Sequence, residues 1–289
     1  MSTTEEKKSE SGTTTLQGSL PLDTGTYQTP PPSALRSACP MINALANHGY
    51  LPRDGRQVTA ADLESAMSLV GLSPFLGGLF SNAVFLEHPT PDSPKPSLFS
   101  RLRAILRNPW EILPHRLGVI LPGQAETTSA ENPPIRAPTL TLADLSLHGA
   151  IEHDVSLSRR DEAQGDNHTP QHDLIYEIMA ASNGDKTLTM DDLCALRKRR
   201  IRTQRTDNQE LQYGSFEHEL GCGEIALMLK IFGDGESVKR DYLQAFFAEE
   251  RLPLAEGWDM TRRRSWWKRL GLVELKWTVE QVKKRIGKV

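Results

Sequence analysis

A single cysteine near the start of the chain has neighbours that favour reactive chemistry. Cys39 directly precedes Pro40 and an alanine-rich run, in a segment (residues 36–53) that reads Arg-Ser-Ala-Cys-Pro-Met-Ile-Asn-Ala-Leu-Ala-Asn-His-Gly-Tyr-Leu-Pro-Arg. Because proline suits the first position of a helix, we expect Cys39 at or beside the helix cap. Free backbone N–H groups and the helix dipole favour a thiolate there, and a thiolate can bind a metal. Taken alone, a cysteine next to proline is more commonly a small buried apolar residue.

A second group of residues combines acids, an imidazole and hydroxyls in one short stretch. Residues 152–161 read Glu-His-Asp-Val-Ser-Leu-Ser-Arg-Arg-Asp. A carboxylate, a main-chain carbonyl and a hydroxyl this close in sequence suit a hard cation such as magnesium or calcium. A run of this composition is more commonly a solvated loop or a helix cap.

The third candidate is a carboxylate on an apolar helix. Residues 221–234 read Gly-Cys-Gly-Glu-Ile-Ala-Leu-Met-Leu-Lys-Ile-Phe-Gly-Asp, so nearly every face of such a helix is apolar except at Glu224 and Lys230. We expect Glu224 to be largely buried, which would make it an exchangeable proton carrier near neutral pH. The alternative is an ion pair or a cap near the helix start. Glu217 and Glu219 lie in a polar stretch, and we expect them to be exposed.

Together the three segments resemble the haem-thiolate peroxidase family, which contains the chloroperoxidases and the unspecific peroxygenases. The first resembles the Pro-Cys-Pro signature followed by Asn-x-Leu-Ala-Asn-His-Gly-Tyr-Leu-Pro-Arg, with Ala38 where the family usually has proline. The second matches Glu-His-Asp-x-Ser-Leu-Ser-Arg, and its histidine is typical of the short branch of the family. The third is similar to the Gly-Glu-Ala-Ala-Leu segment, and residues 251–258 resemble the closing Arg-Leu-Pro-x-x-x-Gly-Trp signature. The resemblance covers residues 33–75 and 140–260.

The resemblance implies a site with two opposite sides. On one side, haem b binds through the thiolate of Cys39, with Pro40 and the amides near Ile42 and Asn43 around the sulfur. On the other side, Glu224 moves a proton between the two oxygens of hydrogen peroxide, and His153 orients it. A divalent cation, Mg2+ or another, touches a haem propionate, and its implied ligands are Glu152, the main-chain oxygen of His153, and Ser156.

The activity that follows from the resemblance is a peroxygenase or peroxidase that uses hydrogen peroxide to oxidise or oxygenate a small organic substrate, with a place in fungal-type secondary metabolism. Two alternatives stay open at this point. A halogenating or one-electron peroxidase would use the same residues, whereas a non-catalytic haem-binding protein would need Cys39 but not Glu224 beside His153.

Hydrophobic spacing predicts a mainly α protein. We expect helical segments at 59–70, 142–147, 172–181, 189–205, 219–232, 237–249 and 279–286, because no stretch shows sustained alternation of polar and apolar residues. Residues 1–33, rich in Ser, Thr, Gly and charge, should form a flexible or wrapping arm. Residues 34–289 would then form one chloroperoxidase-like helical domain around a buried haem, interrupted by an irregular Pro-rich insertion at 87–140 that includes an amphipathic piece at 98–106.

Composition excludes few functions. With 34 basic and 37 acidic side chains the net charge is −3, so no global basic field favours nucleic acid or a membrane surface as the main partner. No window approaches the roughly 18 apolar residues of a membrane span, and no apolar run follows the first charged residues, which favours a cytoplasmic location. Three cysteines cannot form a disulfide scaffold in a chain this long. We expect a monomer or a homodimer.

Several other features have ordinary explanations. His48 is a rival ligand in a helix-ending His-Gly-Tyr, where we expect a structural role. The basic run at 197–205 should be a solvated helix face. Phe75, Phe80 and Phe85 are candidates for a substrate channel, although aromatic residues at such spacing are more commonly core.

Overall fold

The computed structural model describes residues 23–85, 139–146, 151–182 and 184–287. Nearly all of the Pro-rich insertion expected at 87–140, including its amphipathic piece at 98–106, lies outside the described residues. Across the described ranges the protein is helical apart from one short two-stranded sheet, which confirms the mainly α prediction.

The elements follow one another in a simple order. They are α1 (Pro40–Asn47), α2 (Ala60–Leu69), α3 (Pro74–Phe85), the 3-10 helices η1 (Leu142–Ser146) and η2 (Glu162–Gln164), α6 (His172–Ala180), β1 (Thr187–Thr189), α7 (Met190–Asp207), α8 (Ser215–Ile231), β2 (Ser237–Lys239), α9 (Arg240–Ala248), η3 (Trp266–Lys268) and α10 (Leu272–Ile286). Helix α3 and both strands were missed by the sequence analysis, and its segment at 237–249 divides into β2 and α9.

Two of the helices begin where the sequence predicts because each has a complete capping box. The Thr59 hydroxyl accepts from the Asp62 amide at the start of α2, and the Asp62 carboxylate accepts from the Thr59 amide. Thr189 and Asp192 repeat this exchange at the start of α7. Reciprocal bonds of this kind satisfy amides that the first helical turn leaves unpaired. Helix α8 begins four residues before the predicted 219, and the Glu217 carboxylate accepts from the Gly214 amide there.

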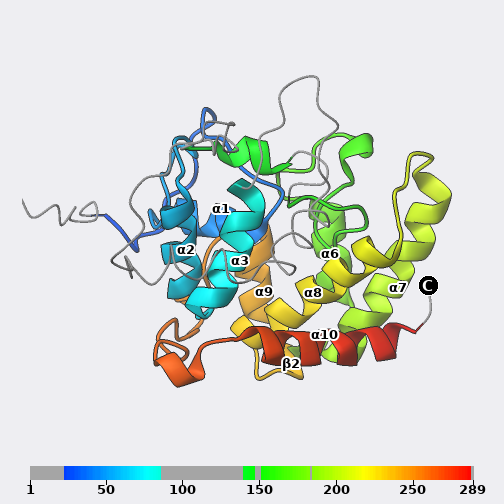
Figure 1. Cartoon of the computed structure of the whole chain (residues 1–289). Coiled ribbons are helices and arrows are strands. Elements are labelled where there is room, and N and C mark those ends of the chain that lie inside the picture. Colours follow the sequence, from blue (N-terminus) through cyan, green and yellow to red (C-terminus); the bar gives the residue numbers. More distant parts are fainter. Residues whose placement is uncertain (1–22, 86–138, 147–150, 183, 288–289) are drawn as a thin grey trace, which may run out of the picture.

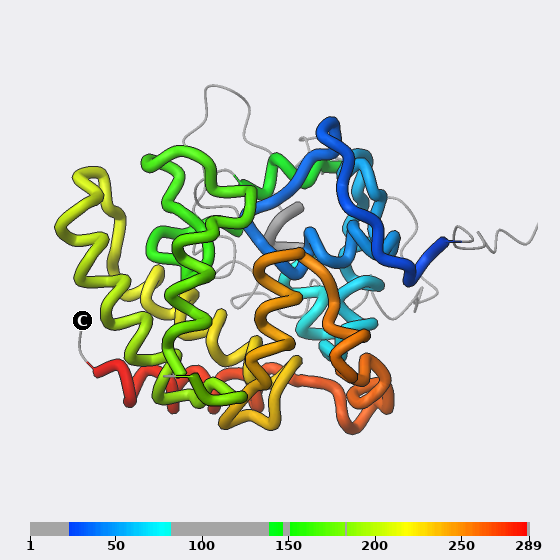
Figure 2. The backbone as a smooth tube through the Cα atoms, turned by 180° about the vertical axis from the view of Figure 1, so that it is seen from behind, coloured from blue at the N-terminus to red at the C-terminus, as the bar shows by residue number. Residues whose placement is uncertain are grey.

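The helices surround one continuous apolar core. Figure 1 shows α1, α2 and α3 on one side of the molecule and α6, α7 and α8 on the other, with α9 between them and α10 along one edge. The reverse view in Figure 2 has the same two groups with their sides exchanged. Helix α10 packs along α8 and α7, while α9 contacts both α6 and α1. Residues from both groups contribute to the core. Helix α1 and the loop before α6 therefore have fixed positions relative to α8.

The segment 23–33, assigned to a flexible or wrapping arm, wraps against the end of α1. The amides of Gly25 and Gln28 donate to the carbonyls of His48 and Asn47. Arg53 holds the same segment through an ion pair to Asp23 at 2.9 Å. This part of the arm is therefore fixed, because it supplies the carbonyls and amides that complete the end of α1.

None of the helices in the described ranges is long and apolar enough to cross a membrane.

Candidate active site

Helix α1 places Cys39 at its N-terminal cap. Pro40 occupies the first helical position, as the sequence predicts, and every later residue of the helix is buried. The backbone amides of Ile42 and Met41 act on the Cys39 thiol and lower its pKa, although no amide of the first turn makes a cap hydrogen bond to the sulfur. The Asn43 amide makes an ordinary helical bond to the Cys39 carbonyl at 3.2 Å, so the second amide that acts on the thiol is that of Met41 rather than Asn43.

Burial, more than the helix terminus, governs the free thiol. It raises the pKa of Cys39 above the usual value, while the Ile42 and Met41 amides and the charge of Arg159 lower it. The amides of the helix terminus thus act in the expected direction, toward the thiolate, but burial of the thiol acts more strongly against it. A metal bound at the sulfur would displace the proton, and the same amides would then stabilise the thiolate.

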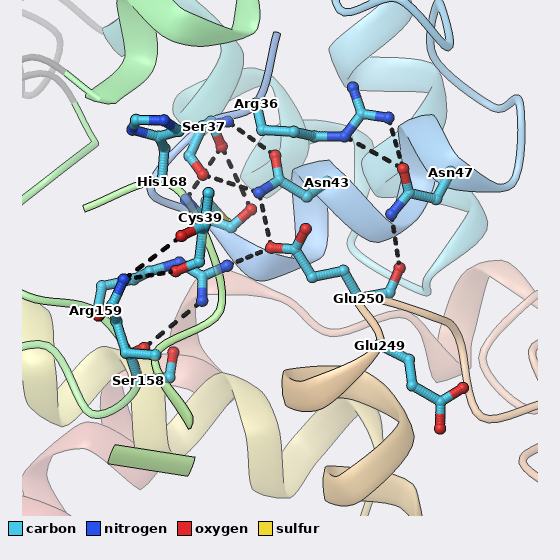
Figure 3. Close-up of polar contacts among 12 residues, drawn as sticks. Arg36, Ser37, Cys39, Asn43, Asn47, Ser158, Arg159, His168, Glu249 and Glu250 are labelled. Atoms are coloured by element: carbon cyan, nitrogen blue, oxygen red, sulfur yellow. Dashed lines mark hydrogen bonds and ion pairs between the residues drawn. The ribbon is translucent and has the colours of Figure 1, made fainter. Parts of the chain in front are cut away.

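A buried carboxylate organises the residues around Cys39. Figure 3 shows the side chains of Asn43 and Arg159 meeting at one oxygen of Glu250. The Asn43 amide group donates to that oxygen at 2.8 Å, and the Arg159 guanidinium forms an ion pair with it. Burial raises the pKa of Glu250 and lowers that of Arg159, in each case against the attraction of the partner. Both charges are thus held in the interior by each other.

The same asparagine fixes the chain that leads into Cys39. The backbone amide of Ser37 donates to the side-chain oxygen of Asn43, and the side-chain nitrogen of Asn43 donates to the Ser37 carbonyl, both at 2.8 Å. The Cys39 amide donates to the Ser37 hydroxyl at 3.0 Å. The approach to the sulfur is therefore held by hydrogen bonds, although Ala38 stands where related sequences usually have proline.

His48 is engaged at both ring nitrogens. Its Nδ1 lies 2.9 Å from the Gly25 carbonyl, and its Nε2 accepts from the Leu252 amide at 3.1 Å. A neutral ring that donates from Nδ1 satisfies both contacts. The ring has no nitrogen left for a metal, which removes His48 as a rival ligand.

The loop that contains His153 has an unusual backbone held by buried side chains. Val155 is fully buried with φ of 64°, a conformation that β-branched residues rarely adopt. The Asp161 carboxylate accepts from the Val155 amide at 2.8 Å, and Arg197 donates to the Val155 carbonyl at 2.7 Å. The Asp154 carboxylate accepts from the Gln212 amide at 2.6 Å. These bonds fix the turn and so the positions of the residues on either side of it.

The carboxylate of Glu224, on α8, lies close to Ser156, His153 and Arg197. The Ser156 hydroxyl donates to its Oε1 at 2.7 Å, and His153 Nε2 lies 3.8 Å from the same oxygen. Arg197 lies 3.5 Å from the other oxygen, Oε2. The structure thus brings Glu224 and His153 together, as predicted, but the closest partner of the carboxylate is Ser156.

Glu224 is less buried than the sequence predicts. Its side chain keeps 29% of its surface exposed. The carboxylate lies where α8 faces the 151–161 loop, and its recorded partners there are polar. The charge of Glu224 raises the pKa of the Cys39 thiol, whereas the charge of Arg159 lowers it.

Two arginines of the basic run are part of this site. Arg197 and Arg200 are buried, contrary to the expectation of a solvated face, and Arg200 donates to the Ser156 carbonyl at 3.3 Å. Arg197 occupies space that is open only because residue 221 is glycine: a Cβ there would lie 1.6 Å from the guanidinium carbon. The sequence analysis missed both arginines, and the glycine on the facing helix was the available signal.

The residues expected to hold a cation are placed as follows. Glu152 is buried, and its carboxylate accepts from the Glu162 amide at 3.3 Å. His153 Nδ1 lies 3.1 Å from the Asp154 carbonyl. The Ser156 hydroxyl is turned toward Glu224. No group of three or more His, Cys, Asp or Glu side chains suited to a metal occurs among the described residues, and a site built on one carboxylate, a carbonyl and a hydroxyl stays a prediction.

The remaining candidates lie away from this site. Glu219 pairs with Lys283 on the surface at 2.7 Å. Phe75 and Phe80 are exposed on α3, so their assignment to the core is wrong, and the side chain of Phe85 lies outside the described residues. The thiols of Cys194 and Cys222 are free and buried, and burial raises their pKa values to about 11 and about 12.

Comparison with known proteins identifies the family. The model of the family described as peroxidase, family 2, matches residues 25–267, a range that includes Cys39, His153 and Glu224. The chain belongs to this family. Its relatives include an aromatic peroxygenase of Cyclocybe aegerita, 26% identical over 77% of this chain and 54% of that protein. An aromatic peroxygenase of Coprinellus radians is 24% identical over 77% of this chain and 78% of that protein.

A third relative matches over a short segment only. A chloroperoxidase of Leptoxyphium fumago is 48% identical over 48 residues, which are 16% of this chain and 13% of that protein. The family 2 peroxidase described here spans about half the length of the Cyclocybe aegerita relative, with 54% of that protein covered by the match.

Proposed function

We propose that this family 2 peroxidase binds haem b through Cys39 and uses hydrogen peroxide to oxidise or oxygenate a small organic substrate. The proposal rests chiefly on one observation, the meeting of the Glu224 carboxylate with the Ser156 hydroxyl at 2.7 Å and with His153 Nε2 at 3.8 Å. Two relatives are named aromatic peroxygenases and a third is named a dothistromin biosynthesis peroxidase. An aromatic product of secondary metabolism is therefore the first substrate class to test.

The donor set around Cys39 suits a thiolate bound to haem iron. The backbone amides of Ile42 and Met41 and the positive charge of Arg159 all lower the pKa of the Cys39 thiol. Amides and charges near a thiolate tune how strongly it donates electron density to iron. When bound, haem would supply the redox-active iron through which peroxide oxidises the substrate. Cys39 would hold it, and α1 would keep the sulfur in place.

The protein's own part in the reaction is proton movement at Glu224. A general base must reach the proton that it takes, directly or through one water. The Ser156 hydroxyl fixes Oε1 at 2.7 Å, and Arg197 attracts Oε2 from 3.5 Å. A carboxylate held in this position can accept a proton from peroxide. His153, 3.8 Å from Oε1, limits the rotation of the carboxylate, so the same group can return the proton to the departing oxygen.

We further propose the divalent cation site at Glu152, the His153 carbonyl and Ser156. Carboxylate, carbonyl and hydroxyl oxygens are the ligands that Mg2+ and Ca2+ prefer. The Ser156 oxygen can offer a lone pair to the cation while its proton is donated to Glu224. Exhaustive treatment with a chelator should then lower haem retention, and adding Mg2+ should restore it. Haem retention that does not change would refute this site.

The absorption spectrum of the reduced, carbon monoxide-bound protein tests the ligand. A thiolate-ligated haem gives a distinctive red-shifted Soret band, which we expect for the haem-reconstituted protein. Cys39→Ser should lose this band, whereas Cys194→Ser, at a buried free cysteine, should keep it. A reconstituted protein without the band would end the haem-thiolate proposal.

Glu224→Gln tests the acid-base role. Removal of a general acid-base group typically lowers rates by about 10²–10⁴-fold, and we expect that loss in peroxide turnover with an unchanged haem-thiolate spectrum. Glu219→Gln, on the same helix but paired with Lys283 at the surface, is the matched control and should keep full activity. Unchanged turnover in Glu224→Gln would exclude the assignment. Product analysis with chloride present separates oxygenation from halogenation.

A further inference from the structure

The segment from residue 261 to residue 277 has a charge opposite to that of the whole chain. It contains six basic residues and one acid, a net charge of +5, whereas the chain as a whole has −3. It also contains three of the five tryptophans, Trp266, Trp267 and Trp277. Basic residues and tryptophans are therefore concentrated in one short part of the chain.

The aromatic residues of this segment are exposed. Trp266 on η3 keeps 79% of its surface exposed, and Trp277 on α10 keeps 58%. Val273, one helical turn before Trp277, keeps 84%. The rings of Trp266 and Trp267 pack edge to face with centroids 5.8 Å apart. Tryptophan is usually well buried in folded proteins, so a group of exposed ones marks a surface that another phase or partner covers.

The fold holds the segment firmly with these side chains outward. The Arg269 guanidinium donates to the Leu72 carbonyl at 3.2 Å, and the Leu270 carbonyl accepts from the Ser73 amide at 2.9 Å. Arg263 pairs with Glu274 at 3.1 Å. Residues 261–277 are thus a fixed part of the domain, held against the start of α3.

Three of its positive charges have no ion-pair partner. Arg264, Lys268 and Lys276 are exposed, and no ion pair to a carboxylate of the described residues involves them. Glu274, the acid of the segment, is already paired with Arg263 and with Lys230. We call this part of the surface the Trp–Arg patch, and its members are Arg264, Trp266, Trp267, Lys268, Val273, Lys276 and Trp277.

We propose that the Trp–Arg patch docks the protein on the surface of an anionic lipid bilayer, without crossing it. Tryptophan prefers the headgroup level of a membrane, where its ring is in apolar surroundings and its N–H is hydrated. Arginine and lysine next to it are attracted to anionic headgroups. Charge complementarity therefore selects an anionic lipid surface, and the exposed rings supply the apolar contact. The proposal is independent of the haem site.

Binding to vesicles tests this docking. The full-length protein is mixed with vesicles of phosphatidylcholine alone or with phosphatidylserine added, and bound protein is measured by sedimentation together with the tryptophan emission wavelength. We expect binding only to the anionic vesicles, with a blue shift of the emission as the rings leave water. Added salt should weaken it, because the attraction between exposed charges is screened.

Variants separate the two contributions. Trp266→Ala with Trp267→Ala should lower the vesicle affinity by about tenfold or more and remove the blue shift. Arg264→Gln with Lys268→Gln should lower affinity and reduce its salt dependence. The controls change exposed residues elsewhere, Tyr176→Ala on α6 and Arg199→Gln with Arg202→Gln on α7, and should bind like the unchanged protein.

All of these side chains are exposed, so we expect every variant to keep the far-UV circular dichroism and the thermal midpoint of the unchanged protein. Absence of binding to anionic vesicles would overturn the proposal, as would equal losses in the patch and control variants. Binding to single-stranded RNA or dimer formation that depends on the patch, without vesicle binding, would assign the surface to another partner and overturn it too.

Discussion

The carboxylates on the two sides of the candidate site differ in burial and in their partners. Glu250, beside Cys39, is 5% exposed and is paired with the buried Arg159 and with Asn43. Glu224, on the opposite side, keeps 29% of its side chain exposed, and two of its three contacts are 3.5 Å or longer. The side that would hold the iron is therefore the more rigid one.

This difference matches the tasks that we propose for the two sides. An iron ligand must stay at one position, and a buried, mutually dependent set of charges and hydrogen bonds provides that. A group that accepts and returns a proton must reach two oxygens in turn, so longer contacts on a partly exposed carboxylate are suitable. If this interpretation is correct, mutations around Cys39 should act mainly on stability and mutations around Glu224 mainly on turnover.

The largest effect on stability should come from Glu250→Gln. The substitution keeps the shape of the side chain but leaves the Arg159 charge buried without its partner, which typically costs about 3–5 kcal/mol of unfolding free energy. Urea denaturation measures this loss. The control is Glu256→Gln, which breaks a partly exposed pair with Arg251 and should cost about 1 kcal/mol or less. Equal losses in the two variants would contradict the rigid-side interpretation.

A smaller effect, on turnover rather than stability, is expected from Ser156→Ala. It removes the 2.7 Å bond to Glu224, and hydrogen bonds to charged groups contribute about 1.5–3 kcal/mol. We expect peroxide turnover to fall by about tenfold to a hundredfold. Because the Glu224 side chain is partly exposed, water can replace the hydroxyl, and the free energy of unfolding should change by less than about 1 kcal/mol. A stability loss as large as that of Glu250→Gln would remove the distinction between the two sides.

The smallest effect is a pH dependence on the Cys39 side. Burial lowers the pKa of His48 below its ordinary 6.5, so the unfolded chain gains a proton before the folded protein does. The His48 contribution to stability is therefore complete above about pH 6.5 and is lost as the pH falls from there toward the folded-state pKa. Urea denaturation across this range should give a difference in unfolding free energy between the protein and His48→Gln that shrinks toward low pH. A difference independent of pH would show that His48 titrates normally.

Local signals in the sequence were sufficient for the parts of the site that a single segment determines. The proline after Cys39 and the threonine caps of α2 and α7 each predict a helix start from residues within one turn, and the structure has them there. Spacing along one helix does not reveal partners on other elements. Arg159 and Glu250 are 91 positions apart, and a charged residue that is buried in an ion pair has the same local pattern as a solvated one.

The basic run at 197–205 and the Trp–Arg patch both show that a sequence pattern does not tell which charged side chains are exposed. Arg197 and Arg200 were assigned to a solvated face and are buried. The net charge of −3 predicted no basic field for the whole chain. That total conceals the segment of residues 261–277, which has a net charge of +5. In both cases the decisive information is which face a side chain occupies, and that depends on the packing of helices far apart in the sequence.

The contact between Gly221 and Arg197 has a consequence for how this family can diverge. Since a Cβ at position 221 would overlap the guanidinium of Arg197, a larger residue there requires that side chain to move or to be shorter. Relatives that carry a larger residue at the position of Gly221 should also carry a shorter one at the position of Arg197. The two positions should therefore co-vary across the family.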